Sequence, residues 1–217
     1  SKGGNTIEKK AVEVCEALEK RLDAGTPARG FEVEGEDEQS IVRDLQLITS
    51  KPMFYVCNVK EEQLAAGTDD PLVARVKKLA DERGAPVVVI CAAIEAEIMQ
   101  LPKEERADFL ESIGLKEPGL HAVIQTGYRM LDMITYFTAG KVEVRAWTIK
   151  RGTKAPQAAG VIHTDFERGF IRAETIAIDD FLAHKTEAAV KQAGKMRLEG
   201  KEYVVNDGDV MHFRFNV

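Results

Sequence analysis

The chain has 217 residues, of which 44% are hydrophobic and 30% are charged, and its formal net charge at pH 7 is -6. This composition is that of an ordinary globular protein with one large domain or two modest ones, and it excludes a disordered or fibrous chain. The acidic balance excludes a protein that wraps nucleic acid over its whole surface. Residues 1–135 hold 17 Lys and Arg against 25 Asp and Glu, whereas residues 136–217 hold 13 against 11. This change of sign points to two units with different partners.

The cysteine and hydropathy patterns bear on the compartment. Cys15, Cys57 and Cys91 form an odd set without metal-ligand spacing. Cys57 and Cys91 each end an apolar run, where a reduced, buried thiol acts as a small hydrophobic side chain. We therefore expect a protein of the reducing cytoplasm. No apolar stretch approaches the roughly 20 residues that span a bilayer, so no membrane partner is expected.

The first predicted elements are two helices. Asn5 and Thr6 can cap the first one, and the Gly-Thr-Pro sequence from residue 25 ends it. Its apolar residues recur every three or four positions and form one narrow stripe: Ile7, Ala11, Val14, Leu18 and Leu22. Such a stripe is typical of packing on a single partner helix, as in a helical hairpin, and we expect that partner upstream of this chain. Residues 36–48 are predicted to form the second helix.

Strands and helices then alternate. Residues 53–57 and 87–91 are short apolar runs of the kind that form buried parallel strands. A helix is predicted after each strand, at residues 70–83 and 92–99. This order predicts right-handed parallel crossover units of the α/β class. Two strands alone would leave both faces and both edges of the sheet open, so further strands are expected.

Residues 103–113 and 117–133 are predicted to be helical. From Ile134 onward, the sequence changes to short β-rich runs. The β-rich runs that follow are residues 136–138, 142–148, 173–177, 203–205 and 210–215. Helical stretches at 158–168 and 179–192 interrupt them, and the sequence Asn-Asp-Gly-Asp at 206–209 predicts a hairpin turn between the last two strands. We expect a small α+β domain of about 80 residues, the size of a β-grasp unit.

Candidate chemistry gathers at the end of the first strand, where residues 58–61 read Asn-Val-Lys-Glu. Ligands of open α/β sheets bind beyond the carboxyl ends of the strands, and residues 91–93 follow the second strand at the same level. GTP-binding domains carry Asn-Lys-x-Asp here, and the Asp accepts two hydrogen bonds from guanine. Glu61 is one methylene longer than that Asp, whereas Asn58 can still bind the N6/N7 edge of adenine. The alternative is that Asn58 only begins a turn.

Six segments carry further sequence patterns: Lys51 to Glu61, Cys91 to Glu97, Gln125 to Trp147, Ala155 to Gly160, His163 to Glu174 and Asp207 to Met211. They resemble the YchF, or Obg-like, ATPase family. The resemblance implies a helical, coiled-coil hairpin remnant at residues 1–48, the C-terminal half of a nucleotide-binding domain at 49–133, and a TGS domain at 134–217. The implied fold is a partial P-loop-NTPase-type parallel sheet with helices, followed by an α+β, ubiquitin-like β-grasp domain.

The resemblance also implies an ATP site. Asn58 would contact the adenine edge, Val59 would pack near the base, and Glu61 would replace the guanine-selecting Asp. The other residues of the implied site would approach the base with backbone N–H groups: Cys91, Ala92 and Ala93. No catalytic residue and no metal-ligating residue is expected in this chain.

The family's phosphate loop, Gly-x-x-x-x-Gly-Lys-Ser, and its switch segments do not occur in the 217 residues. That loop cradles the phosphates, and its hydroxyl holds Mg²⁺, so the chain is not expected to hydrolyse ATP alone. Hydrolysis and Mg²⁺ binding are expected only together with an N-terminal segment outside this chain.

TGS domains in related proteins are implicated in contact with the ribosome or RNA. Residues that could form such a surface here are Arg168, Arg172, Lys191, Lys195, Arg197, Lys201, Phe166, Phe170 and Tyr203. Acidic neighbours such as Glu167, Glu174 and Glu199 favour an ordinary solvated face instead. Two functions therefore stay open. One is part of a cytosolic ATPase that prefers ATP to GTP and contacts the translation machinery. The other is a non-enzymatic module that binds RNA, ribosome or protein through the β-grasp domain.

Two weaker patterns are interpreted structurally. His163, His184 and His212 lie on different predicted elements, so we expect surface or core histidines rather than a metal site. The pair Asp179-Asp180 is interpreted as the N-terminal cap of the helix that follows. An open sheet edge and a helix stripe without its partner also predict that the chain alone is unstable or self-associates.

Overall fold

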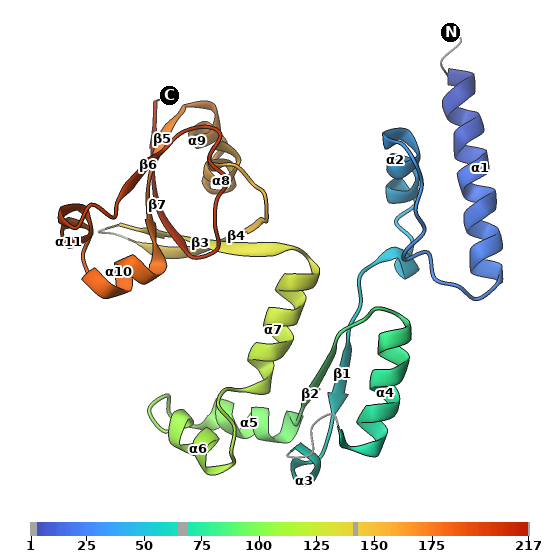
Figure 1. The fold of residues 1–217 in the computed structure, drawn as a ribbon, viewed down its shortest axis with the longest axis horizontal. Helices are drawn as coiled ribbons and strands as arrows, with labels where there is room; N and C mark the ends of the chain where they lie inside the picture. Colours follow the sequence, from blue (N-terminus) through green and yellow to red (C-terminus); the bar gives the residue numbers. More distant parts are fainter. Residues whose placement is uncertain (1–3, 65–68, 141–142, 217) are drawn as a thin grey trace. The chain divides into compact units, whose positions relative to one another are not determined.

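The computed structural model describes residues 4–64, 69–140 and 143–216 (Figure 1). The chain divides into two compact units, an N-terminal unit of residues 1–102 and a C-terminal unit of residues 103–217. The predicted division into three parts, at 1–48, 49–133 and 134–217, stays a prediction. In the described part of the chain, no helix is long and apolar enough to cross a membrane.

Two helices open the N-terminal unit, α1 (Gly4–Asp23) and α2 (Glu36–Asp44). Val14 and Leu18 of the predicted stripe are buried and cluster with Ala28. The Lys10 ammonium lies 2.9 Å from a carboxylate oxygen of Glu38 and ties α1 to α2. The stripe therefore packs in part on residues of this same chain, a contact that the sequence pattern did not predict.

The ends of these helices differ from the prediction. The first helix begins at Gly4, so Asn5 lies within it and not at its N-cap. The second ends at Asp44, before the predicted residue 48, because Gln46 has a left-handed φ of 46° that interrupts the helix. A short 3-10 turn at Ile48–Ser50 follows.

A two-stranded parallel sheet forms the rest of the N-terminal unit. Its elements are β1 (Tyr55–Asn58), α3 (Glu61–Leu64), α4 (Pro71–Glu82), β2 (Val87–Ile90) and α5 (Ala92–Gln100). The register runs from Tyr55↔Val87 to Asn58↔Ile90. The predicted β-α-β-α order is confirmed, although β1 begins two residues later than expected and includes Asn58.

The strands are less buried than their apolar sequences predicted. Among the described residues of both strands, only Val88 is buried, and Val56 is 44% exposed. Cys91 is buried as predicted, while Cys57 is half-buried, and this burial raises the pKa of its thiol. Two strands with few covering helices leave part of each face open to solvent, in line with the expectation that such a pair needs further strands.

The C-terminal unit is built on a five-stranded mixed sheet. Its elements are α6 (Arg106–Ser112), α7 (Gly119–Met130), β3 (Met133–Ala139), β4 (Val144–Lys150), α8 (Ala155–Ile162), α9 (Thr164–Arg168), β5 (Phe170–Ala177), α10 (Ile178–His184), α11 (Glu187–Gln192), β6 (Arg197–Glu199) and β7 (Asp209–Phe215). The strand order is β4-β3-β7-β5-β6. β3 and β7 are parallel at Phe137↔Val210, and the other neighbours are antiparallel. The chain as a whole is a mixed α/β protein.

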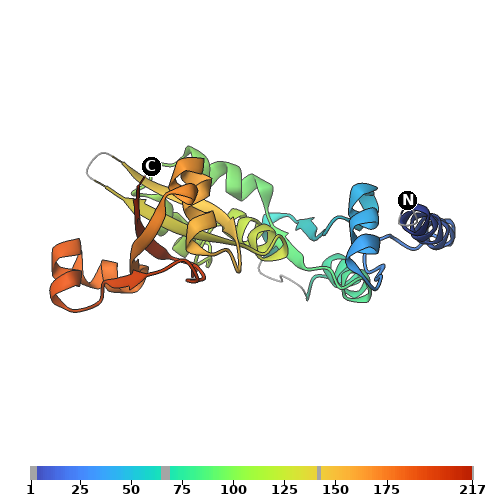
Figure 2. The same cartoon turned by 90° about the horizontal axis from the view of Figure 1, so that it is seen from above.

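Both faces of this sheet carry a core. On one face, Tyr136 and Met211 pack against α8, and the Tyr136 hydroxyl donates to the Ala158 carbonyl at 2.9 Å. On the other face, Phe137 packs with Val190 of α11. Successive residues of a strand point to opposite faces, so α8 and α9 lie on one side of the sheet and α10 and α11 on the other (Figure 1 and Figure 2).

Two predicted helices are interrupted. The one expected to run through His163 divides there into α8 and α9, because His163 is extended with a φ of -160°. The one expected to run through Lys185 divides into α10 and α11, because Lys185 is left-handed with a φ of 62°. Asp179 and Asp180 lie in the first turn of α10 rather than at its N-cap. Carboxylates there still complement the positive end of a helix.

The predicted strand at 203–205 is wrong, and so is the predicted hairpin. Val204 forms a single bridge with Lys154, and the edge strand beside β5 is β6 instead. A turn does occur at 206–209, where the Asp209 N–H donates to the Asn206 carbonyl at 3.2 Å, but it leads into β7 without closing a hairpin. Residue 142, the predicted start of the strand that became β4, lies outside the described residues.

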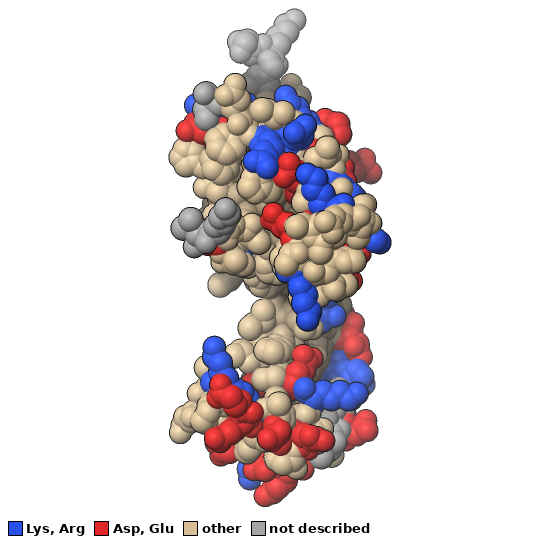
Figure 3. Space-filling model, turned by 90° about the vertical axis from the view of Figure 1, so that its left-hand side faces the viewer, with Lys and Arg blue, Asp and Glu red and all other residues tan. Residues whose placement is uncertain are grey.

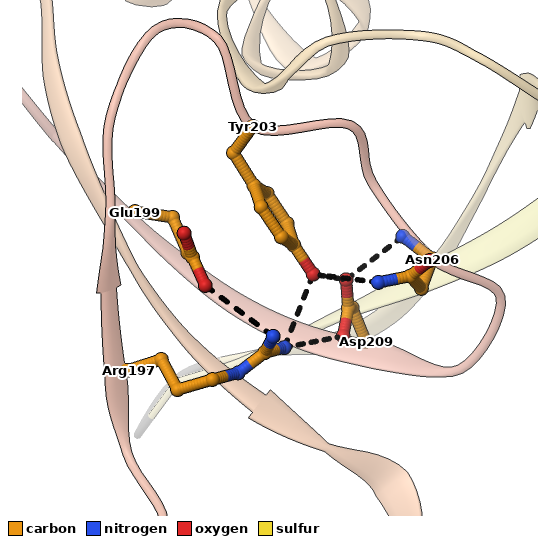
Figure 4. A network of polar contacts seen from close by, with 5 residues as sticks. All are labelled: Arg197, Glu199, Tyr203, Asn206 and Asp209. Carbon is orange, nitrogen blue, oxygen red and sulfur yellow. Dashed lines mark hydrogen bonds and ion pairs between the residues drawn. The ribbon is translucent and has the colours of Figure 1, made fainter.

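A buried carboxylate directs this path of the chain (Figure 4). Asp209 is 2% exposed and accepts hydrogen bonds from the Tyr203 hydroxyl at 2.6 Å, the Asn206 N–H at 2.9 Å and the Arg197 guanidinium at 3.3 Å. Arg197 also lies 3.3 Å from a Glu199 carboxylate oxygen. The carboxylate needs these donors once it is out of water, so it holds Tyr203 in a loop and not in a strand.

Candidate functional site

The carboxyl ends of β1 and β2 lie side by side in the N-terminal unit. Asn58 is the last residue of β1 and pairs with Ile90, the last residue of β2. The next residue along, Val59, donates its N–H to the Ile90 carbonyl at 2.9 Å. The chain then turns into α3, while β2 passes through Cys91 into α5. This is the end of a parallel sheet at which ligands bind.

The Asn58 side chain joins the two loops at this end. Its Oδ1 accepts a hydrogen bond from the Ala92 N–H at 3.0 Å, across 34 positions of sequence. Only the oxygen of an amide can accept, so this contact fixes which half of the amide faces the helix. Asn58 is exposed, and its Nδ2 group is the half that can donate to a ligand. Asn58 therefore does more than begin a turn.

The start of α5 supplies backbone donors beside Asn58. Cys91 is the N-cap and is 3% exposed, whereas Ala92 and Ala93 are exposed in the first turn. The first N–H groups of any α-helix have no acceptor within the helix. Asn58 takes the one from Ala92, and the same geometry presents the N–H groups of Ala93 and Ile94 at the helix end. The structure thus brings residues 58 and 91–93 together, as predicted for one end of the sheet.

Val59 and Glu61 complete the predicted set. Val59 is half-buried, and Glu61 is the exposed first residue of α3. Lys60 lies between them and donates its N–H to Oε1 of Gln63 at 3.1 Å. In the described part of the chain, the hydrogen bond between Asn58 and Ala92 does not involve Glu61. Glu61 therefore lies next to the site, but this bond does not fix the position of its carboxylate.

Gln63 and Asp70 lie at the same end of the sheet, and the sequence analysis did not single them out. Gln63 Nε2 donates to Asp70 Oδ2 at 2.8 Å, and Asp70 Oδ1 accepts from the N–H groups of Leu72 and Val73 at 2.9 and 3.2 Å. The bond from Val73, followed by those from Gln63 and Leu72, lowers the pKa of Asp70 against the effect of its burial. Asp-Pro before an apolar helix is a capping signal that could have found Asp70; nothing in the sequence points to Gln63.

A cavity of about 290 Å³ lies against β1 and the start of α4. Most of its wall is apolar, and its polar side chains are those of Tyr55, Asn58, Gln63 and Asp70. Val59 also lines it. Two of the predicted base-contacting residues, Asn58 and Val59, therefore line the same cavity as the Gln63–Asp70 pair. Its volume is near the lower size limit of small-molecule pockets.

Several known proteins are similar to this chain in sequence. The family model YchF-GTPase_C, described as "Protein of unknown function (DUF933)", matches residues 133–216. "Ribosome-binding ATPase YchF" of Bacillus subtilis (strain 168) is 52% identical over 205 residues, which are 94% of this chain and 56% of that protein. The protein of the same name from Escherichia coli O157:H7 is 48% identical over 217 residues, 100% of this chain and 59% of that protein. The chain belongs to the YchF, or Obg-like, family.

Two solved structures also match this chain. "Structure of the Schizosaccharomyces pombe YchF GTPase" superposes with a TM-score of 0.81 and 37% identity, over 99% of this chain and 58% of that one. A GTP-binding protein from Pyrococcus horikoshii OT3 shares the fold alone, with a TM-score of 0.55 and 17% identity, over 96% of this chain and 57% of that one. The chain thus spans somewhat more than half the length of these YchF relatives.

The histidines of this YchF-family chain do not gather. Across residues 4–64, 69–140 and 143–216, no group of three or more His, Cys, Asp or Glu side chains is arranged to hold a metal ion. His163 accepts the Asp165 N–H at its Nδ1 (3.2 Å) and caps α9. His184 ends α10, and His212 lies in β7.

The basic and aromatic set of the C-terminal unit is partly engaged within the unit. Arg197 is held by Asp209 and Glu199, and Phe170 is 4% exposed in the core. Phe166 stacks on Phe215 with ring centroids 3.9 Å apart. On the face turned toward the viewer in Figure 3, Lys and Arg are mixed with Asp and Glu rather than gathered into one basic patch.

Proposed function

We propose that this chain is the base-reading portion of an Obg-like ATPase, and that it binds ATP in preference to GTP. The observation that carries the proposal is the hydrogen bond from Ala92 N–H to Asn58 Oδ1, which orients the Asn58 amide at the ligand-binding end of the sheet. An amide with a fixed orientation can recognise the edge of a base by hydrogen bonding, whereas a mobile amide cannot.

The preference for adenine follows from hydrogen-bonding chemistry. Nδ2 of Asn58 would donate to N7, which both purines carry, and the second lone pair of Oδ1 would accept from the N6 amino group of adenine. Guanine has an acceptor, O6, where adenine has that amino group. A Glu at position 61 replaces the Asp that accepts from guanine, so the guanine-specific contact is weakened at the same time. Val59 would pack near the base, and Ala92 and Ala93 would approach it through their backbones, with Cys91 as the helix cap.

Phosphate binding and hydrolysis are proposed to come from residues outside these 217. The relatives are longer than this chain, which covers 56 to 59% of two of them. A phosphate loop with its Lys and hydroxyl residue supplies the catalysis of P-loop ATPases and holds Mg²⁺. This chain's own residues would orient the adenine and leave the phosphates to that loop. Their role is positioning, and no bond-breaking step is assigned to them.

Residues 134–217, the larger part of the C-terminal unit, are proposed to be a TGS domain of the ubiquitin-like β-grasp fold that contacts the ribosome in the cytoplasm. The support is the strand order β4-β3-β7-β5-β6, in which a parallel central pair is flanked by antiparallel strands and a helix crosses one face. The names of the bacterial relatives, "Ribosome-binding ATPase YchF", supply the partner. The mixed charge on the face drawn in Figure 3 favours a defined docking contact there over non-specific RNA binding.

The test is a titration of the full-length protein with ATP and GTP. ATP should bind more tightly, and Asn58→Ala should weaken ATP binding by about tenfold to a hundredfold, the range for loss of an amide–adenine pair. Asn216→Ala, an exposed asparagine of the C-terminal unit, is the matched control and should leave the affinity unchanged. Equal or tighter binding of GTP would overturn the adenine preference, and unchanged ATP affinity of Asn58→Ala would overturn the role of Asn58.

A further inference from the structure

Gln63 stands between the base-reading segment and the N-cap of α4. Its Oε1 accepts the Lys60 N–H at 3.1 Å, and its Nε2 donates to Asp70 Oδ2 at 2.8 Å. We propose that Gln63 is a positioning residue that holds the Asn58–Glu61 segment against Asp70 and so sets the geometry of base recognition. The inference rests on the proposed function of that segment.

The contact to Lys60 is half of a capping box. Lys60 precedes α3, and the N–H groups of Gln63 and Leu64 donate to its carbonyl at 3.0 and 3.1 Å. Gln63 is the third residue of the helix and reaches back to the N–H of the capping residue, the arrangement that Glu and Gln adopt at this position. Four residues are too few for a helix to hold its own shape. The turn that carries Glu61 therefore depends on this side chain.

The contact to Asp70 anchors the turn. Asp70 is 8% exposed and is itself held by the N–H groups of Leu72 and Val73, so it is a fixed point on a twelve-residue helix. On the other side, Val59 is held by the Ile90 carbonyl of β2. Among the described residues, Gln63 thus supplies a second anchor for the segment after Val59, in addition to the contact that Val59 makes with the sheet.

The polarity of this chain of hydrogen bonds is fixed. An ionised carboxylate only accepts, so Asp70 forces Nε2 of Gln63 toward itself and leaves Oε1 for the Lys60 N–H. A carboxylate in place of the Gln63 amide would face the Asp70 carboxylate. An amide in place of the Asp70 carboxylate would set two donor groups against each other, although its own oxygen could still cap α4. Changing both residues at once restores each contact, because the new carboxylate at position 63 accepts from the Lys60 N–H and from the new amide at position 70.

This exchange provides the experiment, made in the full-length protein by calorimetric titration with ATP and with inorganic tripolyphosphate. Gln63→Glu and Asp70→Asn should each weaken ATP binding by about tenfold, the loss for one unmade hydrogen bond, and leave tripolyphosphate binding unchanged. The double variant should return to within about threefold of the unsubstituted protein. The control is Glu62→Gln, at an exposed neighbouring residue in α3, and it should leave the affinities for ATP and for tripolyphosphate unchanged.

Three outcomes would overturn the inference: single variants that bind ATP normally, single variants that lose both ligands equally, or a double variant whose losses add. The last two would assign Gln63 and Asp70 to general stability. Asn58→Ala, measured alongside, separates this inference from the proposed function. If Asn58→Ala weakens ATP binding and the other variants do not, only the role of Gln63 fails. If Asn58→Ala has no effect, the base-reading assignment itself fails.

Discussion

Removal of one oxygen atom, by Tyr203→Phe, tests the network around Asp209 in the C-terminal unit. The Tyr203 hydroxyl donates to Asp209 at 2.6 Å and accepts from Arg197 at 3.1 Å and from Asn206 Nδ2 at 3.0 Å. Asp209 is 2% exposed, so water cannot replace the lost donor freely. Arg197 and Asn206 keep Asp209 as a partner, through their guanidinium and N–H groups.

The magnitude follows from the charge on the acceptor. A hydrogen bond to a charged group contributes about 1.5–3 kcal/mol to stability. When the acceptor is buried, the cost of losing a donor lies in the upper part of this range. The two donors that lose the hydroxyl as acceptor lie nearer the surface and recover part of their energy from water. We expect Tyr203→Phe to lower the free energy of unfolding of the C-terminal unit by about 2 kcal/mol.

The assay is urea unfolding followed by tryptophan fluorescence. Trp147 is the sole tryptophan of the chain and lies in β4, so its signal reports on the C-terminal unit. Tyr128→Phe is the matched control: its hydroxyl shares a neutral hydrogen bond of 3.1 Å with Thr148, and Tyr128 is 38% exposed. This control should cost less than about 1 kcal/mol. If Tyr203→Phe lowers the free energy of unfolding by no more than Tyr128→Phe does, the conclusion that the buried Asp209 carboxylate depends on its hydrogen-bond donors is refuted.

Three more predictions use the same assay. Gly208→Ala should destabilise more than Gly152→Ala by about 1–3 kcal/mol, because both glycines are left-handed (φ 84° and 86°) but only at Gly208 would the new Cβ meet a side chain, Ile178 Cγ2 at 2.8 Å; equal losses would contradict this. The Arg214 guanidinium, through its hydrogen bonds, lowers the pKa of Glu174, so the pair's contribution is present above the unfolded pKa of about 4.3 and is lost as the pH falls through the folded value; the cost of Glu174→Gln, about 0.5–1 kcal/mol at pH 7, should therefore vanish in acid. Burial, and then the bond to Asp209, raises the pKa of Tyr203, so its contribution is complete below the unfolded pKa of about 10 and is lost as the pH rises through the folded value; stability should fall less steeply in alkali for Tyr203→Phe than for the unsubstituted chain, and identical slopes would contradict this.

Local signals in the sequence were sufficient for most elements. The apolar runs that became β1 and β2, and the Asp-Pro start of α4, depend on residues close together in the chain. The errors arose where distant contacts decide. Tyr203 and its neighbours have the composition of a strand, but Asp209 and Lys154 hold them in a loop. The left-handed backbone conformation of Lys185 could not be predicted from its residue type.

The sequence was sufficient to predict that Asn58 and residues 91–93 lie at the same end of the sheet, but not to predict their hydrogen bonds. The rule that ligands bind beyond the carboxyl ends of parallel strands placed Asn58 near residues 91–93. It could not show that the Asn58 oxygen faces Ala92, since that pairing depends on the register of β1 and β2. Gln63 was missed because its role depends on two partners, Lys60 and Asp70, that only the fold brings together.

The central claim is that the Asn58 amide reads the adenine edge, and an NMR measurement on bound ATP tests it most directly. In asparagine-labelled full-length protein saturated with ATP, the Asn58 Nδ2 protons should shift and show a nuclear Overhauser effect to adenine H8, which adjoins N7. Asn216, with an exposed side chain, should show neither change. Saturating ATP that leaves the Asn58 amide resonances where they are in the free protein would contradict the account.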